Sequence, residues 1–244
     1  MQPLTARIAL ITGGNTGIGF EIARQLGKRG NHILIGARNS DRGDAAAAAL
    51  RNEGIDARHV RIDLNDPATI EAAAADVETN DGRLDVLVNN AGITSPGDGS
   101  PGVASLDAVR RTFETNFFGT LAVTQAMLPL LKRSASGRIV NVSSGLGSLT
   151  HNGDPVWEFA GVKFIGYNAS KAALNMLTIQ LAAELKDAGI KVNSADPGFT
   201  APDLNGQRGN QTIPEGAAVA IRLALLPDNG PTGGFFSADQ REPW

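Results

Sequence analysis

The chain has 244 residues, of which 42% are hydrophobic and 19% charged, and its formal net charge is −3. This size fits one large α/β domain or two small ones. The mild acidic balance gives no electrostatic reason to expect nucleic acid or an anionic membrane as a partner. The chain has no cysteine, which excludes disulfides and cysteine-ligated zinc, and its three histidines lie far apart in the sequence. We therefore predict no metal site.

The N-terminal segment lacks the basic and then apolar pattern of a secretory signal. No apolar run in the sequence approaches the length of a membrane span. The sequence therefore predicts a cytoplasmic protein without a membrane partner.

Short apolar runs alternate with helix-forming segments from one end of the chain to the other. Strands are predicted at Arg7–Thr12, His32–Ala37, Ala57–Asp63, Leu84–Asn90, Gly137–Ser144, Ile190–Asp196 and Gly234–Ala238. Helices are predicted at Gly17–Arg29, Arg42–Asn52, Pro67–Thr79, Val103–Lys132, Tyr167–Asp187 and Pro214–Leu225. The alternation predicts a Rossmann-type, doubly wound parallel sheet of about seven strands with helices on both faces. The Gly/Pro/Ser-rich stretch Thr94–Ser105 is interpreted as a loop rather than a linker, because the alternation resumes after it, so residues 1–244 form a single domain.

The first predicted strand runs into a glycine-rich turn, Gly13-Gly14-Asn15-Thr16-Gly17-Ile18-Gly19, and then a helix. Glycines at such a turn let the backbone approach a pyrophosphate, whose charge the helix N-terminus favours. The spacing differs from the Gly-x-Gly-x-x-Gly of other dinucleotide folds, and glycines also mark plain tight turns. By itself this turn is a weak indication of a dinucleotide site.

The second predicted strand ends at Gly36-Ala37-Arg38-Asn39. An acid at this point would bind the ribose hydroxyls of NAD, whereas a base accommodates the 2′-phosphate of NADP. Ala37 stands where the acid would be, and Arg38 follows it. This favours NADP(H), although Arg38 could instead be a solvated surface charge.

Further motifs follow in order: Asp63-Leu64, Asn89-Asn90-Ala91-Gly92, Asn116, Ser144, Tyr167-x-x-x-Lys171 and Pro197-Gly198. Together with the glycine turn they resemble the motif set of the short-chain dehydrogenase/reductase family, over essentially the whole chain. A single four-residue motif would arise by chance in about one chain in several hundred, whereas the ordered set is specific for the family. The resemblance implies hydride transfer with a nicotinamide dinucleotide.

The resemblance also implies which residues contact the cofactor, from the pyrophosphate and the adenine to the nicotinamide. The expected cofactor-binding residues are Gly13, Asn15, Thr16, Gly17, Ile18, Gly19, Arg38, Asp63, Leu64, Asn90, Ala91, Gly92, Tyr167, Lys171, Pro197, Gly198 and Thr200. Two departures from the family weaken this assignment. Thr16 stands where many NADP-preferring members carry Lys or Arg, and Pro202 precedes Asp203 where the family often has Thr. Thr200 is the nearest hydroxyl that could serve the carboxamide.

Tyr167 and Lys171 are four residues apart on a predicted helix, so both side chains leave the same face. An ordinary tyrosine ionises at about pH 10, and a lysine ammonium one turn away is expected to lower the pKa of Tyr167. Taken alone, a Tyr-x-x-x-Lys pair usually consists of exposed side chains without a catalytic role. Within this motif set, it implies that Tyr167 donates the proton and that Lys171 also binds the nicotinamide ribose.

Ser144 ends the fifth predicted strand, at the edge where ligands bind in parallel sheets. In the family, a serine here hydrogen-bonds the substrate carbonyl oxygen. Ser143 is the competitor, because successive strand residues face opposite sides. The register Ser144-Gly145-Leu146-Gly147 matches the family and favours Ser144. Asn116 resembles the family asparagine that supports a water chain to the lysine; the alternative is a helix-interior amide that bonds the backbone.

The segment between Ser144 and Tyr167 is longer than is usual in the family. This expansion, at residues 151–164, resembles the carbonyl reductases, as do the ending Gly230–Phe236 and the C-terminal Trp244. Trp157 and Phe159 in the segment would form either an apolar substrate wall or a hydrophobic plug beneath a long loop.

The sequence thus predicts an oxidoreductase that reduces a ketone, aldehyde or quinone to an alcohol with NADPH, with NADH used less well. The alternatives are an NAD-dependent alcohol dehydrogenase working in the oxidative direction and a cofactor-sensing regulator without turnover. A serine hydrolase is disfavoured, because no Gly-x-Ser-x-Gly elbow occurs. The expected partner is a small carbonyl or alcohol substrate.

A homo-oligomer is also expected. The family commonly pairs through the helices represented here by Val103–Lys132 and Tyr167–Asp187, which would bury apolar residues that a monomer exposes. The expanded segment before Tyr167 could instead cover that face and leave a monomer, but it is short for that purpose.

Overall fold

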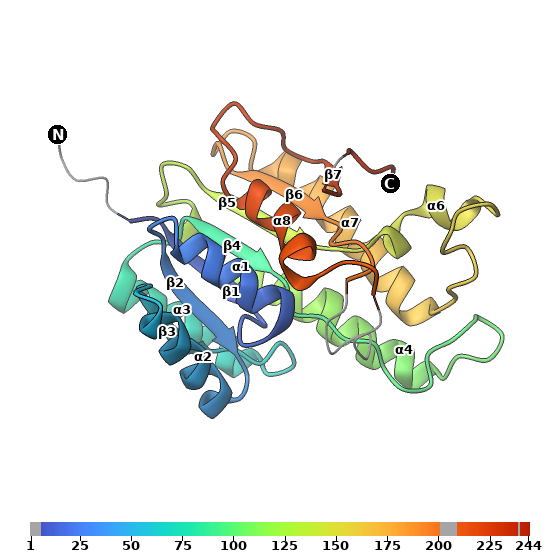
Figure 1. Ribbon diagram of the computed structural model, residues 1–244, viewed down its shortest axis with the longest axis horizontal. Helices are drawn as coiled ribbons and strands as arrows, with labels where there is room; N and C mark the ends of the chain where they lie inside the picture. Colours follow the sequence, from blue (N-terminus) through green and yellow to red (C-terminus); the bar gives the residue numbers. More distant parts are fainter. Residues whose placement is uncertain (1–5, 201–208, 239) are drawn as a thin grey trace.

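The computed structural model describes residues 6–200, 209–238 and 240–244. Within these residues, seven parallel strands form one sheet with the order β3-β2-β1-β4-β5-β6-β7 (Figure 1). The strands are β1 Ile8–Thr12, β2 His32–Ala37, β3 Ala57–Arg61, β4 Val86–Asn89, β5 Arg138–Val142, β6 Lys191–Ala195 and β7 Phe235–Phe236. The order reverses between β1 and β4, which pair through Ala9–Val86, Leu10–Leu87 and Ile11–Val88. This is the predicted doubly wound sheet, and its switch point is where ligands bind in such folds.

The helices cover both faces of the sheet. They are α1 Gly17–Gly27, α2 Ser40–Asn52, α3 Pro67–Asp81, α4 Leu106–Phe113, α5 Thr120–Leu131, α6 Leu149–Gly153, α7 Ile165–Glu184 and α8 Ile213–Ala224. A π-helical turn, η1 Glu114–Gly119, joins α4 to α5, and a 3₁₀ turn, η2 Gly145–Gly147, follows β5. Local chemistry sets the helix ends: α3 begins with Pro67 after Asp66, whose side chain accepts from the Ala68 amide, and ends at Gly82 in the left-handed conformation.

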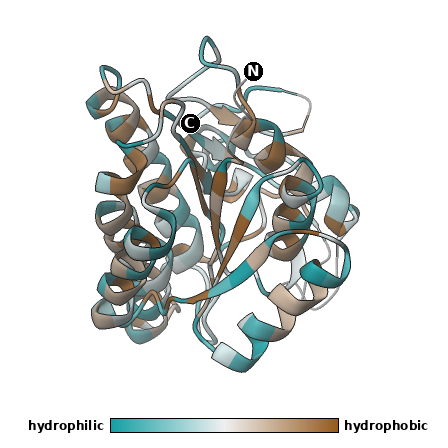
Figure 2. Ribbon diagram, turned by 90° about the vertical axis from the view of Figure 1, so that its left-hand side faces the viewer, coloured by the Kyte–Doolittle hydropathy of each residue, from teal (hydrophilic) through white to brown (hydrophobic). Residues whose placement is uncertain are grey.

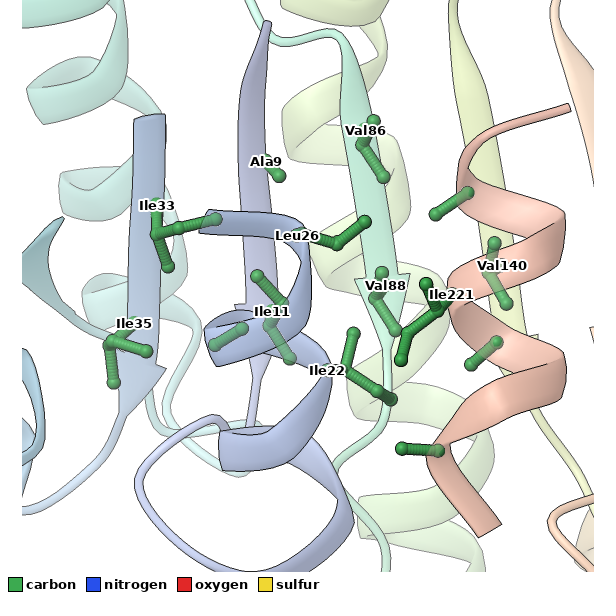
Figure 3. Close-up of a cluster of buried hydrophobic side chains, with 14 of the residues drawn as sticks. Ala9, Ile11, Ile22, Leu26, Ile33, Ile35, Val86, Val88, Val140 and Ile221 are labelled. Carbon is green, nitrogen blue, oxygen red and sulfur yellow. The ribbon is translucent and has the colours of Figure 1, made fainter. Parts of the chain in front are cut away.

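The core consists of two apolar layers, because alternate residues of each strand face opposite sides. On one face, Ile11 of β1 belongs to a cluster with side chains of β2 and β4 that packs against α1, α2 and α8. Figure 3 shows Ile22, Leu26 and Ile221 over these three strands. On the other face, Leu10 belongs to a cluster that includes side chains of α3, α5 and α7. Figure 2 shows the hydrophobic strands between these helices. Burial of both faces explains why β1, β2 and β4 are rich in Ile, Val and Leu.

Several predicted bounds are wrong in detail. The long helix predicted at Val103–Lys132 begins at Leu106 and is interrupted by η1, where Gly119 packs closely on the Leu64 carbonyl. The helix predicted from Tyr167 begins two residues earlier, at Ile165. The short α6 was not predicted; its first turn is held by Ser148, whose side chain accepts from the His151 amide.

Candidate active site

A cleft of about 420 Å³ opens at the carboxyl ends of the central strands. Most of the residues expected to bind a cofactor line it: Gly13, Asn15, Thr16, Gly17, Ile18, Gly19, Arg38, Asp63, Leu64, Asn90, Ala91, Gly92, Tyr167, Lys171 and Pro197. They come from segments far apart in the sequence. The parallel strand order brings them to one edge, at the switch point between β1 and β4.

The glycine turn is held against β4 by a small polar network. The Thr12 hydroxyl accepts from the amides of Asn90 and Ala91, at 3.0 and 3.1 Å. The Asn90 side chain donates back to the Thr12 carbonyl at 3.0 Å. Gly13 has a φ of +63°, and a Cβ at Gly19 would collide with the Asn90 amide, so both positions favour glycine. The result is a turn of bare backbone at the start of α1, the geometry that accepts a pyrophosphate.

Arg38 lies at the rim of the cleft, directly after β2. It is exposed, and Ala37 beside it is buried. Asn39, the next residue, caps α2 by accepting from the Arg42 amide at 2.9 Å. The chain therefore leaves β2 with a cation at the place where an acid would otherwise bind ribose hydroxyls.

The Tyr167–Lys171 pair lies in the first turns of α7, and Asp98 fixes this helix start. The Asp98 carboxylate accepts from the amides of Gly166 and Tyr167, each at 2.9 Å. The Lys171 ammonium lies 5.7 Å from the Tyr167 ring centroid and donates to the Val142 carbonyl at 2.8 Å. Both side chains line the cleft, as the spacing predicted.

The protonation of this pair differs from the expectation. Burial raises the pKa of Tyr167 to about 12, and a hydrogen bond from Ser144 opposes the rise. Burial lowers the pKa of Lys171 to about 8. The sequence-based expectation that the pKa of Tyr167 is lowered is therefore wrong for this structure, because burial is the largest cause and raises it. At neutral pH, Tyr167 is a phenol and Lys171 is largely an ammonium ion.

β5 ends at Val142, and Ser143 and Ser144 follow it directly. Ser144 hydrogen-bonds Tyr167, and its hydroxyl also accepts from the Leu146 amide at 3.2 Å at the start of η2. Ser143 lines the cleft. Its buried hydroxyl has no hydrogen-bond partner among the described residues. A buried hydroxyl without a partner is costly, so Ser143 is suited to bind a ligand in the cleft.

Asn116 is fully buried in η1, and both the oxygen and the nitrogen of its side-chain amide form hydrogen bonds with the backbone. Its side-chain oxygen accepts from the Ile93 amide at 2.8 Å, and its nitrogen donates to the Ile93 carbonyl at 3.0 Å and to Ser170 at 3.1 Å. The side chain thus holds the segment after Gly92 against α7. Asn116 does not line the cleft.

Gly198 and Thr200 also lie outside the cleft lining. The Thr200 hydroxyl donates to the Pro197 carbonyl at 2.8 Å and packs against Gly216 of α8. Pro202 and Asp203 lie outside the described residues. Of Pro197, Gly198 and Thr200, which were expected to border the nicotinamide, Pro197 alone lines the cleft.

The expanded segment at residues 151–164 packs against the two turns that flank Tyr167. Trp157 stacks on His151 with ring centroids 4.8 Å apart, and its indole edge lies against Gly145, next to Ser144. Phe159 contacts both Trp157, at 5.4 Å, and Phe199, at 5.8 Å, between ring centroids. An aromatic row thus runs from α6 to the residue after Gly198, and its rings are not among the residues that line the cleft. The substrate wall and the hydrophobic plug both stay predictions.

Sequence reasoning missed Asp98 and Ser143. Asp98 lies in the loop Thr94–Ser105 and is far in sequence from the helix that it caps, so no local pattern indicates its role. Ser143 was considered only as a rival of Ser144.

The described residues contain no group of three or more His, Asp or Glu side chains that could hold a metal ion. No helix in the described part of the chain is long and apolar enough to cross a membrane.

The fold and the cleft define a dinucleotide-binding oxidoreductase with a Tyr-x-x-x-Lys pair. A family model described as short chain dehydrogenase matches residues 7–212. The (+)-neomenthol dehydrogenase of Arabidopsis thaliana is 35% identical, with 98% of this chain and 99% of that protein covered. The NADPH carbonyl reductase 1 of Mus musculus is 33% identical, with coverages of 97% and 98%. The NADPH-bound carbonyl reductase from chicken fatty liver is similar in structure, with a TM-score of 0.86, 27% identity, and coverage of 99% of this chain and 100% of that one.

The chain therefore belongs to the short-chain dehydrogenase/reductase family, as its motifs indicated. It is an oxidoreductase of this family, which acts on carbonyl or alcohol substrates with NAD(P).

Proposed function

We propose that the protein is an NADPH-dependent carbonyl reductase that converts a ketone, aldehyde or quinone into an alcohol. The observation that carries the proposal is the hydrogen bond between Ser144 and the hydroxyl of Tyr167, a residue that lines the cleft. Two hydroxyl groups at this point can bind a carbonyl oxygen and protonate it. The relatives named as NADPH carbonyl reductases support the same direction.

Three structural observations support the binding of a dinucleotide in the cleft. Gly13 and Gly19 provide backbone without side chains, and a Cβ at Gly19 would collide with Asn90, which follows β4. The Ser143 hydroxyl is buried and without a protein partner among the described residues. Lys171 reaches the cleft beside Gly92, where it would hold the nicotinamide ribose. Arg38 at the rim would pair with a 2′-phosphate, which favours NADPH over NADH.

NADPH, when bound, supplies the hydride to the carbonyl carbon. Ser144 then holds the carbonyl oxygen, and Tyr167 donates its phenolic proton to that oxygen as negative charge develops there. The Lys171 ammonium stabilises the resulting phenolate. We assign Asn116 a positioning part in this cycle, because it fixes the Ile93 backbone and Ser170 beside Lys171.

The direct test is a panel of ketones, aldehydes and quinones assayed with NADPH and with NADH. We expect turnover on at least one class, with a higher kcat/KM for NADPH. Activity confined to alcohol oxidation with NAD would favour the dehydrogenase alternative, and binding of NADPH without turnover on any carbonyl would favour a cofactor-sensing protein.

A further inference from the structure

The His59 side chain fills the space between the end of β2 and the first turn of α2. His59 lies in β3 opposite Ile35 of β2, and α2 packs on both strands. Only 8% of the side chain is exposed, so the imidazole is enclosed by the protein. The ring is held by contacts on two sides, one with β2 and one with α2.

On the side of β2, the imidazole holds the last residue of that strand. The Nε2 atom of His59 lies 3.1 Å from the carbonyl oxygen of Ala37. Because a carbonyl oxygen can only accept, Nε2 carries the hydrogen and donates it. The same carbonyl accepts from the Ile62 amide at 3.1 Å, so two donors fix its direction. Ala37 and Ile62 both line the cleft, and Arg38 follows Ala37 directly.

On the side of α2, the imidazole takes the place of a side chain at Gly43. A Cβ at Gly43 would collide with the Cδ2 and Nε2 atoms of His59. Gly43 is buried in α2, and its amide donates to the Asn39 carbonyl at 3.0 Å. Glycine is a poor helix former, so the lack of space explains a glycine here better than helix propensity does. Asp44 lies 3.4 Å from Nδ1 of the ring, but it is 71% exposed and adds little.

The two contacts of His59 enclose the backbone of Arg38. Ala37 precedes Arg38, and Asn39, which follows it, is the N-cap of α2. The Nε2 hydrogen bond holds Ala37, and the contact between the ring and Gly43 sets the distance of the first turn of α2. The backbone that carries Arg38 is thus fixed at both ends, while its side chain is exposed at the rim of the cleft.

We propose, on the basis of the proposed function, that His59 is a positioning residue for cofactor discrimination: it holds the β2–α2 turn where Arg38 reaches the 2′-phosphate of NADPH. A charge-assisted pair between a guanidinium and a phosphate depends on the direction of its hydrogen bonds. A turn that moves would weaken this pair, and the loss would be confined to ligands that carry the 2′-phosphate. His59 therefore acts on the choice between NADPH and NADH and not on the transfer of hydride.

Two ligands that differ only in the 2′-phosphate test this role: adenosine 2′,5′-bisphosphate and 5′-AMP. The ratio of their Kd values, measured by calorimetry, reports recognition of that phosphate without hydride transfer. His59→Phe keeps a ring in the space but removes the donor to Ala37, and His59→Gln keeps a donor of similar reach. Gly43→Ala forces the α2 turn away from the ring. His32→Phe, at the opposite end of β2 from Ala37, is the matched control.

We expect 5′-AMP to bind all four variants about as tightly as the wild type. The preference for the bisphosphate should fall by about fivefold in His59→Phe, the effect of one lost hydrogen bond, and it should also fall in Gly43→Ala. His59→Gln and His32→Phe should keep the wild-type preference. A preference that persists in His59→Phe would overturn the inference, and so would an equal loss of affinity for both ligands, which indicates a purely structural role. If His59→Phe does not fold, Gly43→Ala decides in the same way.

Amide hydrogen exchange in the free protein separates this inference from the proposed function. Residues 38–43 should exchange faster in His59→Phe than in the wild type, because the turn has lost a contact at its start. Equal exchange would overturn the positioning role, whatever the cofactor preference is. A wild type that binds both ligands equally tightly would contradict the NADPH preference itself and leave His59 no discrimination to support.

Discussion

At the scale of single residues, two positions bear on the choice between NADPH and NADH and on the pH range of the proposed reaction. Arg38 is exposed at the rim after β2, where its charge is free of the desolvation cost that a buried cation would carry. Lys171 is buried beside Tyr167, and its pKa of about 8 places its titration near neutral pH. We propose that the first residue governs cofactor choice and that the second governs the pH range of the reaction.

The substitution Arg38→Asp should reverse the cofactor preference. The wild type is expected to have a higher kcat/KM with NADPH, because a guanidinium can pair with the 2′-phosphate. An aspartate at the same place would repel that phosphate and bind ribose hydroxyls instead. We expect the ratio of the two kcat/KM values to change by about a hundredfold, corresponding to roughly 3 kcal/mol for a charge-assisted pair. Arg42→Asp, at an exposed position in the first turn of α2, is the control; an equal effect there would indicate a diffuse charge effect.

Carbonyl reduction should weaken as the pH rises through about 8, the pKa of Lys171. The sign follows from the two groups: the Lys171 ammonium is present below this pH and lost above it, while Tyr167, with a pKa of about 12, stays protonated throughout. We therefore expect kcat/KM for reduction to be flat below this midpoint and to fall above it. Lys171→Arg keeps the cation and should remove the fall. A wild-type profile that stays flat well above the midpoint would contradict this assignment.

At the scale of elements, the end of the chain holds the expanded segment in place. The Thr150 amide and hydroxyl donate to the Trp244 carbonyl oxygen at 3.0 and 2.7 Å, and His151 pairs with Glu242 at 3.0 Å. Trp244 in turn stacks on Phe235 of β7, with ring centroids 5.6 Å apart. Residues 240–244 therefore anchor α6 to the sheet, and α6 carries the start of the aromatic row.

Glu242→Ala should accordingly loosen α6 and weaken binding of bulky aromatic ketones. The variant leaves His151 without its partner and frees the ring on which Trp157 stacks. We expect KM for a bulky ketone to rise by about tenfold, the effect of roughly one lost hydrogen bond, with the cofactor Kd unchanged. Glu158→Ala, an exposed position in the same segment, is the matched control. If both variants leave KM unchanged, the aromatic row is a plug rather than a substrate wall.

At the scale of the whole molecule, the sheet was predictable because the strand–helix alternation is regular and both faces are buried. The glycine turn and the Tyr167–Lys171 pair were predictable for a similar reason, since each is a local pattern. The cap of α7 by Asp98 was not, because it depends on a contact between distant parts of the chain. The protonation of Tyr167 was predicted with the wrong sign, because sequence spacing shows the lysine but not the extent of burial.

A homodimer remains our proposal for the assembly. Large apolar side chains are exposed along the segments expected to pair, including Leu106 at 70%, Phe118 at 51% and Met176 at 55%. Such residues are costly to leave in water and are typical of an interface. Light scattering coupled to size exclusion should give about twice the 25.4 kDa chain mass at micromolar concentration. The chain mass alone would rule out the dimer, and Met176→Glu is expected to lower the dimer fraction if it forms.

The central claim is that Tyr167 is the proton donor of a carbonyl reductase, and Tyr167→Phe tests it most directly. The substitution removes only the phenolic hydroxyl, so the ring packing and the binding of NADPH should persist. Measured as kcat for the best ketone, together with the Kd for NADPH by fluorescence, the variant should lose about a hundredfold or more of its rate with a nearly unchanged Kd. A variant that keeps more than about a tenth of the wild-type rate would contradict the account, because a positioned general acid contributes more than that.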